Sequence, residues 1–122
     1  MKKDNYFLQD KDKLEELFKM QEKLQKRLGY DLQKISEKHS QKYFNLMFIA
    51  IIEECVEIIR ETPWKPWKKS MTFNQVKLQE EVIDLWHFII NLSIASGLTP
   101  QKLYDKFVEK NTVNHKRQDN GY

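Results

Sequence analysis

Residues 48–57, FIAIIEECVE, and residues 81–90, EVIDLWHFII, each place a pair of acids at i, i+3 spacing inside a strongly apolar run. On a helix this spacing puts both acids of a pair on one face, about one turn apart. The runs therefore predict two core helices whose acids face each other, in an all-α fold. The paired acids are Glu54 and Glu57 in the first run, and Glu81 and Asp84 in the second.

Acids in such apolar surroundings need a positive partner. Ionised carboxylates rarely enter a core unless a cation or a basic side chain meets them. Oxygen donors that converge from two helices suit a hard divalent cation, and Mg²⁺ is the ion we expect. For the neighbouring Glu53, a solvated position on the helix surface is the better interpretation.

The composition indicates one soluble helical domain. The chain has 122 residues, of which 40% are hydrophobic and 32% charged, and it contains only three glycines and three prolines. This length suits a single compact domain. We expect one domain over residues 1–122, with residues 1–9 as an N-terminal extension and residues 111–122 as a basic tail.

The single cysteine, Cys55, excludes a disulfide within the chain and favours a reducing, intracellular setting. We expect it to be a small, buried core residue. The N-terminal lysines are followed by no apolar signal segment, and no apolar run reaches the length of a membrane span. The sequence thus predicts a cytoplasmic protein with no membrane partner.

Apolar spacing and capping residues predict four helices, over residues 10–28, 40–61, 72–96 and 99–110. Asp10 or Asp12 can cap the first, and Gly29 can end it. Residues 30–40 are polar and form either a short helix or an ordered connection. The expected architecture is therefore a bundle of four to five helices.

Two other features have a structural and a functional interpretation. The loop over residues 62–69 carries prolines that forbid a helix, and its Trp64, Trp67 and lysines either bind a nucleotide or close the end of the bundle. The position of this loop between the two acid pairs favours the interpretation that it binds a ligand.

Gln21 lies on the apolar stripe of the first helix. For this residue, a hydrogen bond to a neighbouring helix is favoured over contact with a ligand.

A magnesium site beside basic residues suits a nucleoside triphosphate, because Mg²⁺ usually bridges protein carboxylates to phosphates. No strong protein nucleophile is evident, so water is the simpler attacking group. A Gly-rich phosphate loop is also missing, which argues against a P-loop NTPase.

Several motifs, in their order along the chain, resemble the all-α NTP pyrophosphatase superfamily of MazG-like proteins and dimeric dUTPases. The dimeric dUTPase-like family is the more similar group. The resemblance covers most of the chain from Leu14 onward. The motifs are Met20-Gln21, Glu54-x-x-Glu57, Trp64-Lys-Pro-Trp-Lys68, Glu81-x-x-Asp84-Leu-Trp-His-Phe88 and Lys110-Asn-x-x-Asn114-x-x-Arg117-Gln-x-x-Gly-Tyr122.

This resemblance implies a homodimeric, Mg²⁺-dependent enzyme of all-α fold that hydrolyses dUTP to dUMP and pyrophosphate with a metal-activated water. It implies that the metal ligands are Glu54, Glu57, Glu81 and Asp84, and that Glu54 or Glu57 accepts the water proton. It further implies uracil contacts from Gln21 and Asn114, and base stacking by Phe88 and by Trp64 or Trp67. The implied phosphate contacts are Lys110, Arg117 and Tyr122, with help from Lys65 or Lys68, so that residues 111–122 form a phosphate-binding tail.

Alternatives remain for the substrate and for the class of protein. Better-known dimeric dUTPases are longer, and Gln25 stands where that family has asparagine, so a broader (d)NTP pyrophosphatase acting on dCTP is the alternative enzyme. A di-iron bundle is disfavoured because, of the histidines, only His87 is suitably spaced from an acid. A non-enzymatic module for nucleic acid or a protein partner is also disfavoured, because paired acids repel a polyanion. No nucleic-acid partner is expected.

Overall fold

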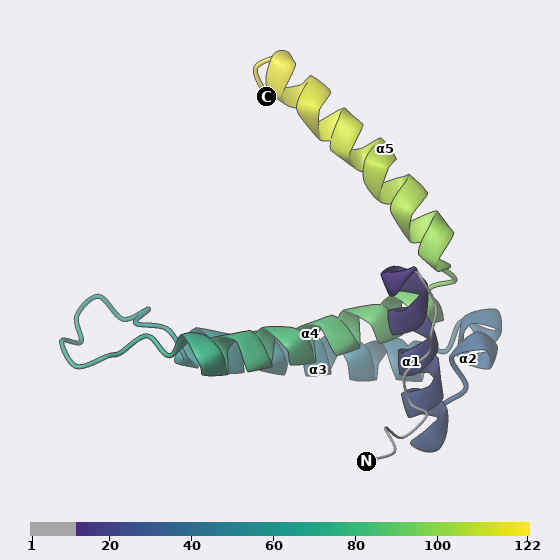
Figure 1. Cartoon of the computed structure of the whole chain (residues 1–122), viewed down its shortest axis with the longest axis horizontal. Coiled ribbons are helices and arrows are strands. Elements are labelled where there is room, and N and C mark those ends of the chain that lie inside the picture. Colours follow the sequence, from purple (N-terminus) through teal and green to yellow (C-terminus); the bar gives the residue numbers. More distant parts are fainter. Residues whose placement is uncertain (1–11) are drawn as a thin grey trace.

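The computed structural model of the protein describes residues 12–122, which form five helices and no strand. The predicted all-α class is confirmed. The expected extension over residues 1–9, and Asp10 as a possible cap, lie outside the described residues. The helices are α1 (Lys13–Arg27), α2 (Leu32–Lys38), α3 (Gln41–Arg60), α4 (Gln75–Ala95) and α5 (Pro100–Asp119) (Figure 1).

Polar side chains at the predicted positions start the helices. The Asp12 carboxylate accepts hydrogen bonds from the backbone N–H groups of Leu14, at 2.9 Å, and Glu15, at 3.1 Å. Such a cap satisfies N–H groups that have no partner within the helix. Gly29, with φ of +94°, follows the end of α1 in the left-handed conformation that favours glycine. The capping residues of the later helices are Asp31, Ser40, Asn74 and Thr99.

The prediction that the last helix ends near Lys110 is wrong, because α5 continues to Asp119. The apolar periodicity that marks a helix fades after Val113, which suggested an irregular tail. No glycine or proline interrupts residues 101–120, however, so nothing in the local sequence stops the helix. Gly121, with φ of +77°, follows its end. The predicted basic tail is therefore mostly the distal half of a long helix.

The long helices α3 and α4 form an antiparallel hairpin, and α1 and α2 pack against one end of it (Figure 1). The core lies at this end, where α3 begins and α4 finishes. Beside the other half of the hairpin, which leads to the loop over residues 61–74, residues 12–122 place no further helix. The fully buried apolar residues are Phe18, Leu32, Tyr43, Met47, Ile90, Ile94 and Ala95.

Helix α5 leaves the core at a bend of 101° from α4 and projects away from the hairpin (Figure 1). It packs lightly against α1, and none of its residues is buried. No single helix in residues 12–122 is long and apolar enough to cross a membrane. Helices α4 and α5 reach the required length and composition only when they are taken together, and this pair is bent.

Large apolar side chains remain exposed along the hairpin. Ile49 and Ile52 on α3 are 64% and 65% exposed, and Trp86 on α4 is 54% exposed. Cys55, which we expected to be buried, is also exposed. The reason is that α3 is apolar on nearly all sides, while the described part of one chain covers only the side that faces α4 and α1. Apolar surroundings in the sequence therefore did not ensure burial.

Replacing Ile94 tests the position of the core. Ile94 is 2% exposed, so Ile94→Ala should lower the free energy of unfolding by about 2–4 kcal/mol through lost packing and a residual cavity. Val76→Ala on the same helix is the control, because Val76 is 68% exposed and should change stability by about 0.5 kcal/mol or less. Urea unfolding at one fixed protein concentration measures both. Equal losses for the two variants would contradict this assignment of the core.

Candidate metal and nucleotide site

Three of the four predicted acids converge between α3 and α4. Carboxylate oxygens of Glu54, Glu57 and Glu81 all lie within 4.8 Å of one another. Glu54 is only 7% exposed, while the other two are half-buried. Asp84 is exposed and lies outside this group of three, although it is one turn further along α4 from Glu81. We refer to Glu54, Glu57 and Glu81 as the acid cluster.

Burial and neighbouring carboxylates raise the pKa values of Glu54 and Glu57. Burial raises the pKa of Glu54 to about 8, with further increases from a hydrogen bond shared with Glu81 and from the charges of Glu57, Asp84 and Glu81. The pKa of Glu57 is also raised, first by burial and then by Glu81. In addition, Oε1 of Glu54 is buried without a hydrogen-bond partner. Without a cation, Glu54 and Glu57 therefore keep their protons to higher pH than a free carboxyl group does.

This donor set fits a hard cation. Converging carboxylate oxygens are the ligands that such ions prefer, and a bound cation would offset the repulsion between the acids. It would also supply the partner that Oε1 of Glu54 lacks. Asp84 is placed to add a further oxygen from the next turn of α4.

Gln21 of α1 shares a cavity with a residue of α4. It is buried, and it lines a cavity of about 330 Å³ together with His87, which is one turn beyond Asp84 on α4. Nδ1 of His87 is 2.9 Å from the carbonyl oxygen of Ile83. The cavity is also lined by Met20, Lys23, Leu24 and Arg27.

Gln25 has a structural role that the sequence did not reveal. Its side-chain oxygen accepts a hydrogen bond of 2.8 Å from the Tyr43 hydroxyl, and both residues are buried. The contact joins α1 to α3 and satisfies two polar groups inside the core. Because the partners are 18 residues apart, no local pattern pointed to this pair.

The tryptophans do not close the end of the bundle. Trp64 and Trp67 are 45% and 71% exposed, with ring centroids 5.9 Å apart in an edge-to-face arrangement. Their loop lies at the end of the hairpin opposite α1, so it is not beside Gln21 (Figure 1). Lys65 lies 5.3 Å from the Trp64 ring, and the following Lys68 is exposed. Phe88, by contrast, is half-buried and packs against the core.

The basic residues of α5 lie apart from the acid cluster. Lys110, Asn114 and Arg117 share one face of the helix at i, i+4, i+7 spacing, and all are exposed. The Arg117 guanidinium carbon lies 5.4 Å from the centroid of the Tyr122 ring. The structure thus pairs two predicted phosphate contacts with each other, but it does not bring them to the acids in one chain.

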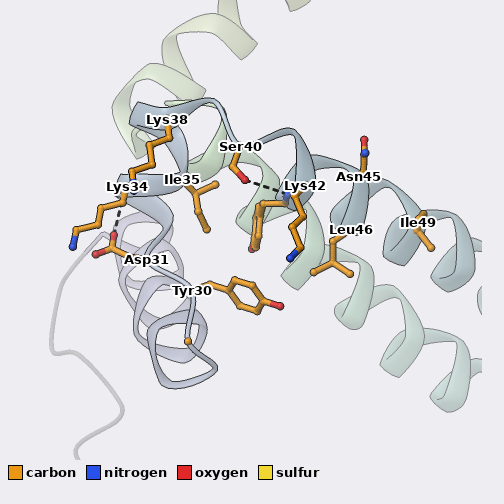
Figure 2. Close-up of a pocket in the computed structure, with 12 residues that line it drawn as sticks. Tyr30, Asp31, Lys34, Ile35, Lys38, Ser40, Lys42, Asn45, Leu46 and Ile49 are labelled. Carbon is orange, nitrogen blue, oxygen red and sulfur yellow. Dashed lines mark hydrogen bonds between the residues drawn. The ribbon is translucent and has the colours of Figure 1, made fainter.

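A cavity of about 640 Å³ was not predicted and does not include the acid cluster. It lies between α2 and the start of α3, and Figure 2 shows Lys34, Lys38 and Lys42 around it. Its floor is apolar, with Tyr30, Ile35, Tyr43, Leu46 and Ile49 among the lining residues. No periodicity could have revealed this cavity, because it forms where two helices diverge.

Comparison with known proteins identifies relatives over much of this chain. A family model described as dUTPase matches residues 13–102. A dCTP pyrophosphatase of Enterobacteria phage LZ5 is 34% identical over 71 residues, which cover 48% of this chain and 41% of that protein. A dCTP pyrophosphatase of Enterobacteria phage T4 is 28% identical over 71 residues, which cover 48% of this chain and 42% of that protein. The chain thus spans less than half the length of these curated relatives, and no solved structure matches it.

The raised pKa of Glu54 predicts how stability without metal depends on pH. The folded-state pKa of about 8 lies above the ordinary value of 4.5, so the folded protein holds the extra proton between these values. In EDTA, the thermal midpoint should therefore fall as pH rises from about 5 through 8. Glu54→Gln should flatten this dependence, because the neutral amide cannot ionise.

Glu37→Gln is the control for that experiment, because it removes an exposed carboxylate on α2, away from the cluster. Its profile should follow that of the wild type. A wild-type midpoint that stays level or rises over this pH range would contradict the assigned shift.

Proposed function

The chain belongs to the dUTPase family, and on that basis we propose that it hydrolyses a pyrimidine deoxynucleoside triphosphate, dUTP or dCTP, to the monophosphate and pyrophosphate. The observation that supports this proposal is the convergence of Glu54, Glu57 and Glu81 between two helices. Carboxylates this close together repel a polyanion such as a triphosphate. A bound cation would offset their charge and could bridge them to the phosphates.

We further propose Mg²⁺ as that cation, held by Glu54, Glu57 and Glu81, with Asp84 as the fourth carboxylate. When bound, Mg²⁺ would offset phosphate charge and make a nearby water more acidic. The buried Oε1 of Glu54 is the atom with the greatest need for such a partner.

In the proposed reaction, the oxygen of water forms a bond to phosphorus and the bond between the α- and β-phosphates breaks. Pyrophosphate leaves with the bonding electron pair, and the water proton passes to a carboxylate. Glu57 is our candidate for this acceptor, because it is half-buried and solvent reaches it, whereas Glu54 is almost fully buried.

The proposed base contact on α1 is Gln21. Gln21 lines the cavity beside His87, and its amide can both donate and accept hydrogen bonds, so it can pair with uracil or with cytosine. The family description favours dUTP, and the names of the phage relatives favour dCTP. Asn114 is the proposed second base contact, with Phe88 and Trp64 or Trp67 as the stacking groups.

A homodimer is the proposed assembly. The uncovered half of the hairpin exposes Ile52 and Trp86, and α5 exposes Phe107, which is 70% exposed. Exposed apolar area on this scale indicates an interaction surface. A second copy would bury it and stabilise a small core.

Magnesium should stabilise the protein through the acid cluster. At pH 8, millimolar Mg²⁺ should raise the thermal midpoint by several degrees, because the ion binds the folded state. Glu81→Gln should lose most of this increase, and Glu37→Gln should keep it, since Glu37 is an exposed residue of α2, away from the cluster. Differential scanning fluorimetry with and without EDTA measures the shift. An equal response from all three proteins would contradict metal binding at the cluster.

Pyrophosphate release tests the activity directly. The wild type should release pyrophosphate from dUTP or dCTP with Mg²⁺ and not with EDTA, and Glu57→Gln should lower kcat by at least about 100-fold while remaining folded. A panel of dNTPs and NTPs measured under one condition decides the base preference. Release from purine nucleotides at the same rate would exclude pyrimidine specificity, and no release from any nucleotide would overturn the proposed function.

A further inference from the structure

The cavity between α2 and the start of α3 has the size of a small-molecule site. Its volume is about 640 Å³, and pockets that hold small ligands measure roughly 300–1,000 Å³. It is lined by α2, by the first turns of α3 and by the connection from Gly29 to Asp31. It shares no lining residue with the acid cluster or with the cavity beside Gln21, so it is a separate place in the fold.

The floor of this cavity is apolar and partly aromatic. Tyr30 and Tyr43 contribute rings whose centroids are 5.3 Å apart, with 59° between the ring planes. The Tyr43 hydroxyl is bonded to Gln25 inside the core, so Tyr43 offers the cavity its ring and not its polar end. A flat ring system can therefore bury apolar surface here. The aliphatic residues of the floor are Ile35, Leu46 and Ile49.

Three exposed lysines surround this floor: Lys34 and Lys38 of α2, and Lys42 of α3. Among residues 12–122, none of their ammonium groups forms a hydrogen bond or an ion pair. In Figure 2 the Lys42 side chain extends toward the same space as the Tyr30 ring, while the other two lie along α2 at the rim. An ammonium group is a donor only, so the rim is suited to acceptors that carry negative charge.

The polar groups beside the lysines are already used by the helix starts. The Asp31 carboxylate accepts a hydrogen bond of 3.2 Å from the backbone N–H of Lys34, and Oγ of Ser40 accepts one of 3.4 Å from that of Tyr43. Among the lining residues, Asp31 is the single acid beside three lysines. The cavity therefore has an excess of positive charge and calls for an anionic ligand.

We propose that this cavity is a second ligand site, which binds a nucleoside di- or triphosphate without a metal ion. The base lies against Tyr30 and the aliphatic floor, and the phosphate oxygens accept hydrogen bonds from Lys34, Lys38 and Lys42. Stacking on an aromatic ring accepts any base, since every base has a π-face. The cavity is separate from the acid cluster, so its occupancy does not depend on the proposed function.

The lining favours this ligand over a peptide or a second copy of the chain. Helices α2 and α3 use their backbone groups internally, so they offer no strand edge to an extended peptide. Two copies that met through this face in a symmetric dimer would bring the same three lysines together. Repulsion between the ammonium groups opposes that contact, whereas a polyphosphate is attracted to them.

Titration with ADP in EDTA tests the site. EDTA removes the cation that the acid cluster needs before it can accept phosphates, so binding under this condition reports the cavity. Isothermal titration calorimetry should show one saturable site per chain. Adenosine and pyrophosphate should each bind at least about ten-fold more weakly than ADP, because the first cannot use the lysines and the second cannot use the aromatic floor.

Variants of the rim and the floor identify the groups involved. Lys38→Ala combined with Lys42→Ala should weaken ADP binding at least about ten-fold. Leu46→Glu should also weaken it, because this change puts a carboxylate on the floor and keeps the lysines; Leu46 is 43% exposed, so the fold should tolerate the change. Circular dichroism of each variant checks that lost binding is not lost fold.

Two controls keep the rest of the protein constant. Lys13→Ala removes an exposed lysine from the first turn of α1, roughly 21 Å along that helix from Arg27, and should bind ADP within about two-fold of the wild type. Glu81→Gln alters the acid cluster and should also keep ADP binding. Loss of ADP binding in Glu81→Gln, with full binding in the double lysine variant, would place the nucleotide at the cluster and overturn the proposal.

Amide chemical shifts locate the ligand without any substitution. On ¹⁵N-labelled wild-type protein in EDTA, ADP should move the amide signals of residues 29–49 and leave those of residues 75–84 in place. No saturable binding at millimolar ADP, or pyrophosphate that binds as tightly as ADP, would overturn the proposal. Shifts confined to residues 54–57 and 81–84 would do the same.

The outcomes for the cavity and for the proposed function are distinguishable. If the wild type releases no pyrophosphate from any nucleotide, the proposed function fails, and the ADP titration still decides whether the cavity is a ligand site. If pyrophosphate is released and ADP does not bind in EDTA, the proposed function stands and the second site fails.

Discussion

The approach of Glu54, Glu57 and Glu81 to within 4.8 Å of one another is the constraint on which the rest of this structure depends. Negative charges held this close oppose folding unless protons or a cation offset them. The apolar residues on both sides of the acids hold α3 and α4 together despite that repulsion. The acid cluster therefore lies within the α3–α4 hairpin, which is also the central structural unit of the fold.

The distribution of the core follows from this arrangement. Buried apolar contacts are concentrated where α1 and α2 cover the hairpin, and the Tyr43–Gln25 hydrogen bond connects α3 to α1 in the same region. The acid cluster lies further along the hairpin, where fewer elements cover it. A well-packed end thus anchors a more open end, which leaves the carboxylates accessible to an ion and a substrate.

Helix α5 extends the molecule beyond the core (Figure 1). It contributes little to the core, and none of its residues is buried. Its length places the Arg117–Tyr122 pair far from the corner where the helix begins. The tertiary structure therefore keeps these basic side chains apart from the acid cluster of the same chain.

The sequence by itself determined the helical class, the helix starts at Ser40 and Thr99, and the pairing of the acids, because these depend on local spacing and capping. It did not predict the exposure of Cys55, the continuation of α5 past Lys110, the bond from Tyr43 to Gln25 or the cavity beside Lys38. The burial of a side chain, a hydrogen-bond partner distant in the sequence and a cavity all depend on which helix surfaces are covered by other helices. Helical periodicity does not show which surfaces these are. Only the tertiary structure decided that Glu81 joins Glu54 and Glu57 while Asp84 stays outside, because the packing of α4 on α3 sets which turn faces the cluster.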